Sequence, residues 1–197
     1  QVKVYDHDGK LRRTIGKPGG QQFGLYDERG MCRPAGMAVD SKGQLWVAEQ
    51  NYAPKRVSLW NAATGKFIKG LYGPPKYGGG GHWDPKDPSR FYYSSGLQGI
   101  EFKVDWKSGE SKPRGIFHHK TYNAVKERLQ QPGDIGARCP DSSVYTNGRH
   151  YMVNSFFGSA YFGDGPGQVF LFDDARCLAR PVVYIGFPGK TPETCTF

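Results

Sequence analysis

The histidines of this chain are candidates for chemistry, because their side chains could bind a metal ion. His118 and His119 are adjacent, while His82 and His150 lie elsewhere in the sequence. Imidazole is a common zinc ligand, but neighbouring residues on a strand point to opposite faces, so adjacent histidines rarely bind one ion. We therefore predict no metal site at this pair and expect it to lie in a solvated loop.

Two acidic clusters, at residues 6–9 and at Asp173 and Asp174, could supply oxygen ligands to calcium. Neither matches the twelve-residue EF-hand loop. Aspartate is also typical of tight turns, because its side chain accepts hydrogen bonds from nearby backbone N–H groups. We predict turns at both places and no cofactor, with calcium as the open alternative.

The sequence motifs assign no catalytic residue. Carboxylates such as Asp84, Asp87 and Asp134 are scattered along the chain. There is no G-x-S-x-G nucleophile elbow and no G-x-x-x-x-G-K-[S/T] phosphate loop, and the glycine run at residues 78–81 is not a nucleotide fingerprint. A non-catalytic role is favoured, and an enzymatic one stays open.

Aromatic and basic side chains near two expected long loops are the candidates for ligand binding. Flat rings beside polar donors suit sugars and other flexible polar ligands. The same side chains could instead pack between structural units. The candidate ligand-binding residues are Tyr52, Arg56, Tyr77, His82 and Trp83.

The net charge of the 197-residue chain is +9, from 27 basic and 18 acidic residues. Such a balance could attract nucleic acid, an anionic polysaccharide or an acidic partner chain. Lysine and arginine form no block of five or six like charges, so we expect a basic solvated surface and no nucleic-acid partner. Because no run of about 18 apolar residues occurs, we also predict no membrane span.

Alternating strands joined by tight turns recur four times, which predicts an all-β fold. Gly 28, Pro 14, Tyr 12, Phe 12 and Trp 4 are typical of many short strands with turns. Two further hairpins, at residues 37–48 and 144–153, precede the second and fourth copies, and the latter carries the hairpin signal Asn147-Gly148. The four copies lie at residues 2–16, 57–73, 102–117 and 169–186.

Four-stranded antiparallel units at this spacing are typical of the blades of a β-propeller. We attribute the uneven spacing to long loops at residues 17–31, 74–89 and 118–140, and a β-sandwich with insertions is the alternative. We predict one partial propeller domain over residues 1–197. Its expected parts are a half-blade at 1–16, blades at about 31–73, 74–117 and 132–186, and a tail at 187–197.

Residues 33–60 resemble the NHL repeat, through RPAGMAVDSKGQLWVAE followed by Asn51 and KRVSLW at residues 55–60. The resemblance implies a hairpin turn at Asp40 and Gly43 and a third strand opened by Arg56. The chain departs from the pattern at Glu49, where the family usually has Asp, and in extra residues at 52–54. The segments at 72–81 and 84–88 are similar to long loops of large secreted bacterial NHL proteins.

The NHL family includes scaffolds, RNA-binding propellers, ligand-binding ectodomains and a few lyases, so the resemblance narrows function little. It implies a non-catalytic scaffold, extracellular or in the cell envelope, that binds a protein or polysaccharide partner. One alternative is a hydrolase or lyase whose site lies on the channel face and is completed by missing blades. A second alternative is an RNA-binding propeller.

Three and a half blades fall short of the four to eight that propellers contain. Open blades leave apolar faces and strand edges uncovered. We therefore expect a second fragment or partner chain to complete a larger ring, for example a six-bladed one. An unusually small four-bladed closure is the alternative.

The four cysteines, Cys32, Cys139, Cys177 and Cys195, form no C-x-x-C pair of a zinc or redox site. An even number is compatible with one or two disulfides in an exported protein. Cys139 and Cys177 flank one expected blade and are the preferred pair, with four free thiols as the alternative.

Overall fold

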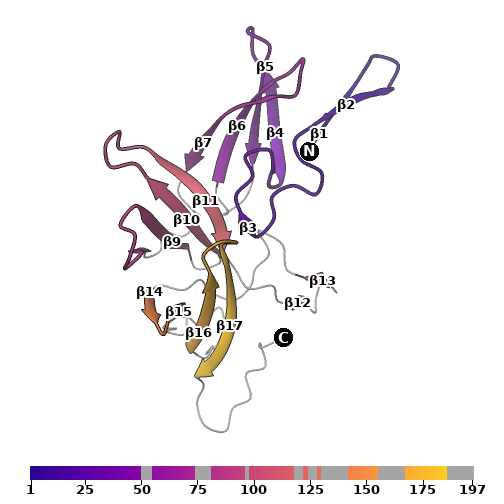
Figure 1. Ribbon diagram of the computed structural model, residues 1–197. Coiled ribbons are helices and arrows are strands. Elements are labelled where there is room, and N and C mark those ends of the chain that lie inside the picture. The colour runs from indigo at the N-terminus through magenta and orange to yellow at the C-terminus, as the bar shows by residue number, and fades with distance from the viewer. Residues whose placement is uncertain are drawn as a thin grey trace, which may run out of the picture.

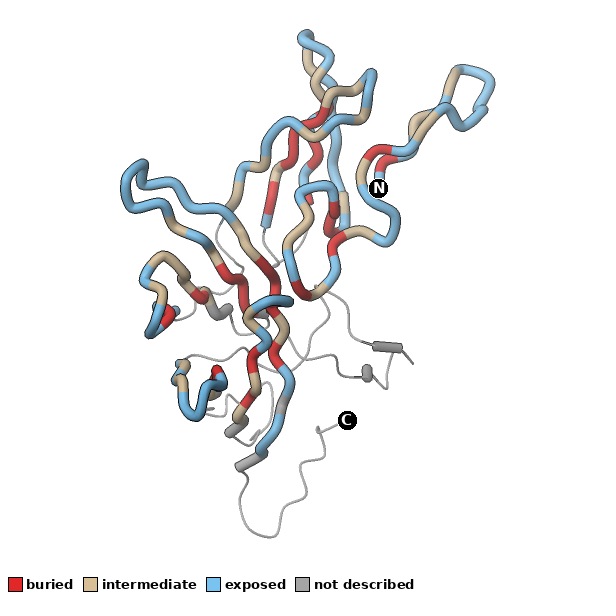
Figure 2. Tube along the Cα trace, in the orientation of Figure 1, coloured by how far each residue is buried: buried red, intermediate tan, exposed pale blue. Residues whose placement is uncertain are grey.

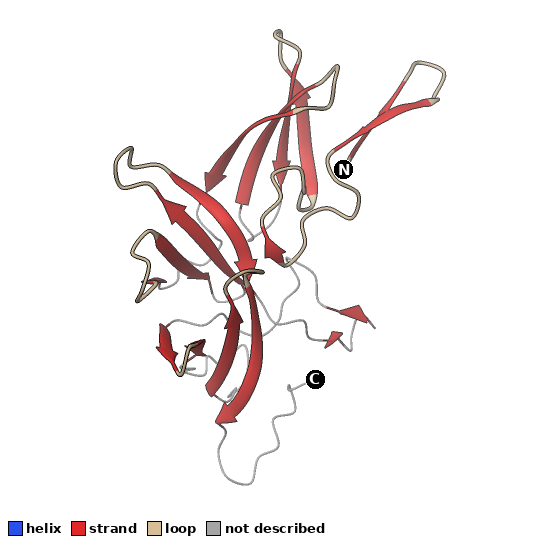
Figure 3. Cartoon of the chain, in the orientation of Figure 1, coloured by secondary structure: helices blue, strands red, loops and turns tan. Residues whose placement is uncertain are grey.

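The structure is a computed structural model that describes residues 1–49, 55–73, 81–95, 98–117, 122–123, 128–129, 142–154 and 167–185. Within these residues every regular element is a β-strand, as Figure 3 shows, and every pairing is antiparallel. The all-β prediction is confirmed. Among the described residues there is no helix with the length and apolar character needed to cross a membrane.

Three sheets and an N-terminal hairpin make up the described fold, and Figure 1 shows the hairpin of β1 (Val2–Tyr5) and β2 (Leu11–Ile15) beside the first sheet. The first sheet has the order β4 (Pro34–Val39), β5 (Gln44–Glu49), β6 (Lys55–Asn61), β7 (Phe67–Gly73). The second has the order β3 (Gly24–Leu25), β11 (Ser111–Phe117), β10 (Gln98–Val104), β9 (Arg90–Ser95), β8 (Gly81–Trp83). The third has the order β14 (Ser142–Thr146), β15 (Arg149–Asn154), β16 (Gly167–Asp173), β17 (Leu178–Ile185). A separate short pair joins β12 (Tyr122–Asn123) and β13 (Arg128–Leu129).

Each expected blade contains four strands of one of these sheets, and these four strands are consecutive in the chain. None of the sheets closes on itself within the described part of the chain. The segment at residues 17–31, expected as a loop, contains the strand β3. Gly24 and Leu25 pair with Ile116 and Gly115 of β11, so the second sheet gains a fifth strand. The two-residue strand carries too little alternation to be predicted.

The four repeated hairpins share one turn chemistry. In three of them an Asp or Asn side chain accepts backbone N–H groups of the turn, and a glycine with positive φ follows. The acceptors are Asp6, Asn61 and Asp105, and the glycines are Gly9 (φ 77°), Gly65 (φ 74°) and Gly109 (φ 74°). The predicted turn at residues 6–9 is therefore present.

Cys177 takes the place of that glycine in the fourth hairpin, with φ 54°. Asp173 accepts the backbone N–H of Arg176 there, at 3.0 Å, as the turn acceptors do elsewhere. A left-handed backbone costs free energy in a residue with a Cβ atom. The side chain of Cys177 is fully buried between the second and third sheets, and this burial offsets the cost.

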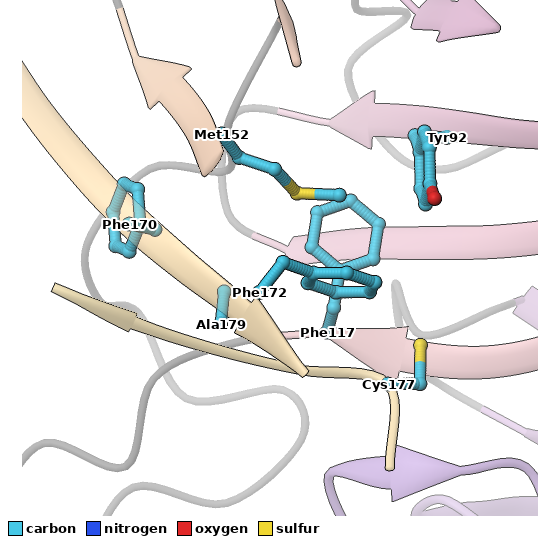
Figure 4. Packing of buried hydrophobic residues seen from close by; sticks show 7 residues of the cluster. All are labelled: Tyr92, Phe117, Met152, Phe170, Phe172, Cys177 and Ala179. Atoms are coloured by element: carbon cyan, nitrogen blue, oxygen red, sulfur yellow. The ribbon is translucent and has the colours of Figure 1, made fainter. Parts of the chain in front are cut away.

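Two apolar cores hold these layers together, and Figure 2 shows the buried segments running along the facing strands. The first lies between the N-terminal hairpin and the first sheet, and consists of Val2, Ile15, Met31, Leu45, Val47 and Trp60. The second lies between the second and third sheets. Figure 4 shows Met152 and Phe172 directed at Phe117 in this second core.

A glycine allows a close approach between the second and third sheets. A Cβ atom on Gly115 would overlap the Sγ and Cβ atoms of Cys177 and the backbone oxygen of Gly24. Real side chains cannot tolerate such contacts without displacement of the strands. Gly115 is therefore required by packing and not by a special φ.

We predict that Gly115→Ala lowers the free energy of unfolding by about 1–3 kcal/mol, because the added methyl overpacks the interface. Gly36→Ala is the matched control, since its Cβ atom would meet nothing closer than the Cβ of Ala48 at 3.8 Å. Urea denaturation of both variants measures the difference. Equal stabilities would show that the two sheets do not pack as described.

Candidate functional site

Arg56, one of the expected ligand-binding residues, lies inside the protein and is 3% exposed. Its Nε donates to Glu49 Oε1 at 2.8 Å, and its terminal nitrogens donate to the Tyr26 hydroxyl at 2.6 Å, Glu28 O at 2.9 Å and Gly30 O at 2.8 Å. A buried guanidinium with such partners is satisfied within the chain. Arg56 thus fastens the segment at residues 26–30 to the first sheet.

Glu49 completes this first cluster. Its second oxygen accepts the backbone N–H of Cys32 at 2.7 Å, and its first also accepts the Ser58 hydroxyl at 2.7 Å. The Trp60 indole N–H donates to Ser58 Oγ at 2.9 Å. Glu49, at the position where the NHL pattern usually has Asp, therefore connects β5 to β6 and to the segment that contains Cys32.

A second buried cluster, which we call the junction, lies between the second and third sheets. At its centre Glu101 has no exposed surface. One oxygen binds Arg90 Nε at 2.6 Å, and the other binds an Arg114 nitrogen at 2.5 Å and the Cys177 thiol at 3.2 Å. Burial and the Glu101 carboxylate raise the pKa of the Cys177 thiol, so this thiol stays protonated and donates.

Asp84 and Asp174 extend the junction. Asp84 Oδ2 accepts the Tyr92 hydroxyl at 2.6 Å and the Tyr145 hydroxyl at 3.0 Å, and it lies 3.2 Å from an Arg90 nitrogen. Asp174 binds Arg90 at 2.7 Å. Each guanidinium nitrogen of Arg90 therefore contacts a different carboxylate.

The ligand atoms of Asp84, His150 and Asp174 lie within 4.8 Å of one another, a spacing that could hold a metal ion. His150 Nδ1 is 3.1 Å from Asp174 Oδ1. The Arg90 guanidinium, however, already contacts both carboxylates, and a bound cation would lie beside this positive charge. The chemistry of the donor set therefore fits an ionic network better than a metal centre.

Access to the junction also limits its chemistry. Asp84 is 3% exposed and His150 is 2% exposed, so little of either side chain is open to a substrate. Burial by itself raises the pKa of Asp84, but hydrogen bonds from Tyr92, from the backbone N–H groups of Lys86 and Asp87, and from Tyr145 outweigh it. The pKa of Asp84 is therefore lowered and the carboxylate is charged at neutral pH.

Exposed aromatic side chains form a different kind of site on the second sheet. The ring centroid of Trp83 lies 5.0 Å from that of Trp106 and 4.7 Å from that of Phe91. Trp83 is 43% exposed and Trp106 is 63% exposed. We call these three residues the aromatic platform.

The platform is fixed from the protein side. The Trp106 indole N–H donates to the carbonyl oxygen of Pro88 at 3.1 Å, and the ring is exposed where it does not meet Trp83. Lys103 Nζ lies 2.8 Å from Asp87, and this hydrogen bond lowers the pKa of Asp87 to about 2. The register pairs Lys103 with Arg90, so this ion pair belongs to the other face of the sheet from Phe91 and Trp83.

The three expected ligand-binding residues that the structure describes, Arg56, His82 and Trp83, do not form one site. Tyr52 and Tyr77 lie outside the described residues, as do His118, His119 and Asp134. His82 and Trp83 are neighbours on β8, but His82 faces Tyr92, with ring centroids 5.0 Å apart. Trp83 therefore belongs to the platform and His82 to the junction side.

Sequence reasoning missed Trp106 and the junction. The signal for Trp106 was available, because a large apolar residue beside the turn Asp105–Gly109 has little chance of burial. Glu101 gave no such signal, since its partners lie up to 76 residues away along the chain.

The preferred disulfide partner Cys177 is a free, buried thiol, and Cys32 is buried as well. Cys139 lies outside the described residues, so the Cys139–Cys177 pairing stays a prediction that the structure does not support.

Comparison of the chain with protein-family models, with curated proteins and with solved structures finds no match. The NHL resemblance at residues 33–60 is therefore untested. The geometry of the platform and of the junction carries the functional argument.

We predict that stability falls as the pH drops below about 4, the ordinary pKa of aspartate in an unfolded chain. Because the folded pKa of Asp84 is lowered, the unfolded state takes up this proton first, and the stabilisation is lost as the pH falls through the folded pKa. Asp84→Asn should make the acid dependence shallower, while the exposed Asp8→Asn should leave it unchanged. Urea midpoints at a series of pH values measure both, and parallel curves for Asp84→Asn and wild type would contradict the assignment.

Proposed function

We propose that this chain is a non-catalytic β-scaffold of the NHL-propeller type that binds a polysaccharide through the aromatic platform. The observation that carries the proposal is the pair of exposed, adjoining indoles of Trp83 and Trp106, 5.0 Å apart and supported by Phe91. Large exposed apolar groups beside polar ones mark binding surfaces. Flat aromatic faces suit the apolar faces of sugar rings.

Preorganisation supports this function. Because the Pro88 carbonyl oxygen fixes Trp106, little side-chain entropy is lost when a ligand stacks on it. The indole N–H is already used, so recognition depends on ring stacking.

The uncharged character of the platform favours a sugar over RNA. Single-stranded nucleic acid is bound by aromatic stacking together with a positively charged groove. The three platform residues, Trp83, Trp106 and Phe91, include no basic side chain. A hydrolase or lyase would need a reachable acid or base, and the carboxylates Asp84 and Glu101 of the junction are buried.

The propeller architecture is part of the same proposal. Three antiparallel sheets in succession, with one closely packed pair, are the arrangement that neighbouring blades require. The strand β4 is an edge with exposed Met37 and Val39, so a second fragment or partner chain pairing beyond it would cover apolar surface. A secreted or envelope location would give such a scaffold access to polysaccharide.

We predict that Trp106→Ala weakens binding of neutral soluble polysaccharides by about tenfold, because a stacking face is lost. Affinity electrophoresis against a panel of β-glucans, xylans and mannans, with tryptophan fluorescence as a second readout, measures the loss. Trp46→Ala is the matched control: Trp46 is 36% exposed, lies on the first sheet, and its indole N–H is also satisfied internally, by Asp40 at 2.9 Å.

Binding that is lost equally in Trp46→Ala, or that no polysaccharide of the panel shows, would contradict the proposal. Capture of a protein partner that depends on Trp106, in the absence of glycan binding, would replace the polysaccharide by a protein ligand.

A further inference from the structure

A hollow of about 570 Å³ lies against the third sheet, and the core residue Phe172 and the junction residues His150 and Asp174 are part of its lining. Its walls include Leu171, Leu178 and Arg180. The register pairs Leu171 with Arg180 and Asp173 with Leu178, while Phe172, between them, points into the core. Alternation along the strands therefore places these side chains on the outer face.

Three guanidinium groups surround the hollow, on Arg149, Arg176 and Arg180. In the part of the chain that the structure describes, neither Arg149 nor Arg180 has an ion-pair partner. Arg176 lies 3.7 Å from Asp173, and its side chain is 77% exposed, so this pair is weak.

Asp174, the second acidic residue of the wall, does not neutralise the positive charge of the three arginines. The Asp174 carboxylate is bound to Arg90 at 2.7 Å and to His150 at 3.1 Å, on the junction side. The hollow therefore carries more positive than negative charge, in a chain whose net charge is +9.

We propose that this hollow binds an acidic sugar, with its carboxylate or sulfate group held by Arg149 and Arg180. The guanidinium fork matches two oxygens of a carboxylate or sulfate, which gives stronger and more specific hydrogen bonds than a lysine would. Leu171 and Leu178 supply apolar wall for the body of the sugar. The volume falls within the range of small-molecule sites.

This site goes beyond the proposed function, because it lies on a different sheet from the aromatic platform and needs neither Trp83 nor Trp106. Loss of the platform would leave it intact. The two sites together would select a polymer that combines neutral and acidic sugars.

The test titrates the full chain with glucuronic acid, glucose 6-sulfate, inorganic sulfate, inorganic phosphate and neutral glucose, by calorimetry and ligand-observed NMR. We expect at least one acidic sugar to bind, glucose not to bind, and binding to weaken as salt is added. The first two ligands distinguish a carboxylate from a sulfate group. The double variant Arg149→Gln/Arg180→Gln should weaken binding by about tenfold or more.

The double variant Lys66→Gln/Lys69→Gln, exposed on the first sheet, removes the same charge and should bind as wild type does. Arg180→Lys keeps the positive charge but removes the guanidinium fork, and it should also weaken binding. It tests the proposal if the glutamine double variant does not fold. The proposal is overturned by no binding of either acidic sugar, by equal loss in the lysine control, or by inorganic ions binding as tightly as the sugars. A Trp106→Ala chain that keeps acidic-sugar binding separates this site from the platform.

Discussion

The buried carboxylate of Glu101 is the interaction on which the described structure depends. It has no exposed surface and binds Arg90, Arg114 and the thiol of Cys177, which lies on the third sheet. A buried charge left without partners costs several kcal/mol, so these contacts must form together. Glu101 thereby couples the packing of the second sheet to that of the third.

The functional surfaces follow from this coupling. Arg90 connects Glu101 to Asp84, and Asp84 accepts backbone N–H groups of Lys86 and Asp87 at 2.8 and 2.9 Å. These bonds shape the turn whose Pro88 carbonyl orients Trp106. On the other side Arg90 takes up the charge of Asp174, which leaves the arginines of the outer hollow available. The junction thus supports both surfaces.

Local signals in the sequence predicted the all-β class and the sheets, because hairpin alternation and turn glycines act over a few residues. The turns at Gly9 and Gly109 are examples of such local signals. Contacts between sheets could not be predicted, since Glu101 and Cys177 are 76 residues apart. The same reason explains why Arg56 was expected at a ligand site: its exposure depends on a loop that folds over it. Closure of the sheets into a propeller depends on contacts around the whole ring, so the sequence of one sheet does not predict it.

The coupling between Arg90 and Asp174, which joins the second sheet to the third at 2.7 Å, is the most direct measure of this account. A double-mutant cycle with Arg90→Met and Asp174→Asn, followed by urea denaturation, isolates that pair from its neighbours. The account predicts an interaction energy of about 1–3 kcal/mol between the two sites. Stability changes that add within about 0.5 kcal/mol would show that the sheets are not joined through this junction.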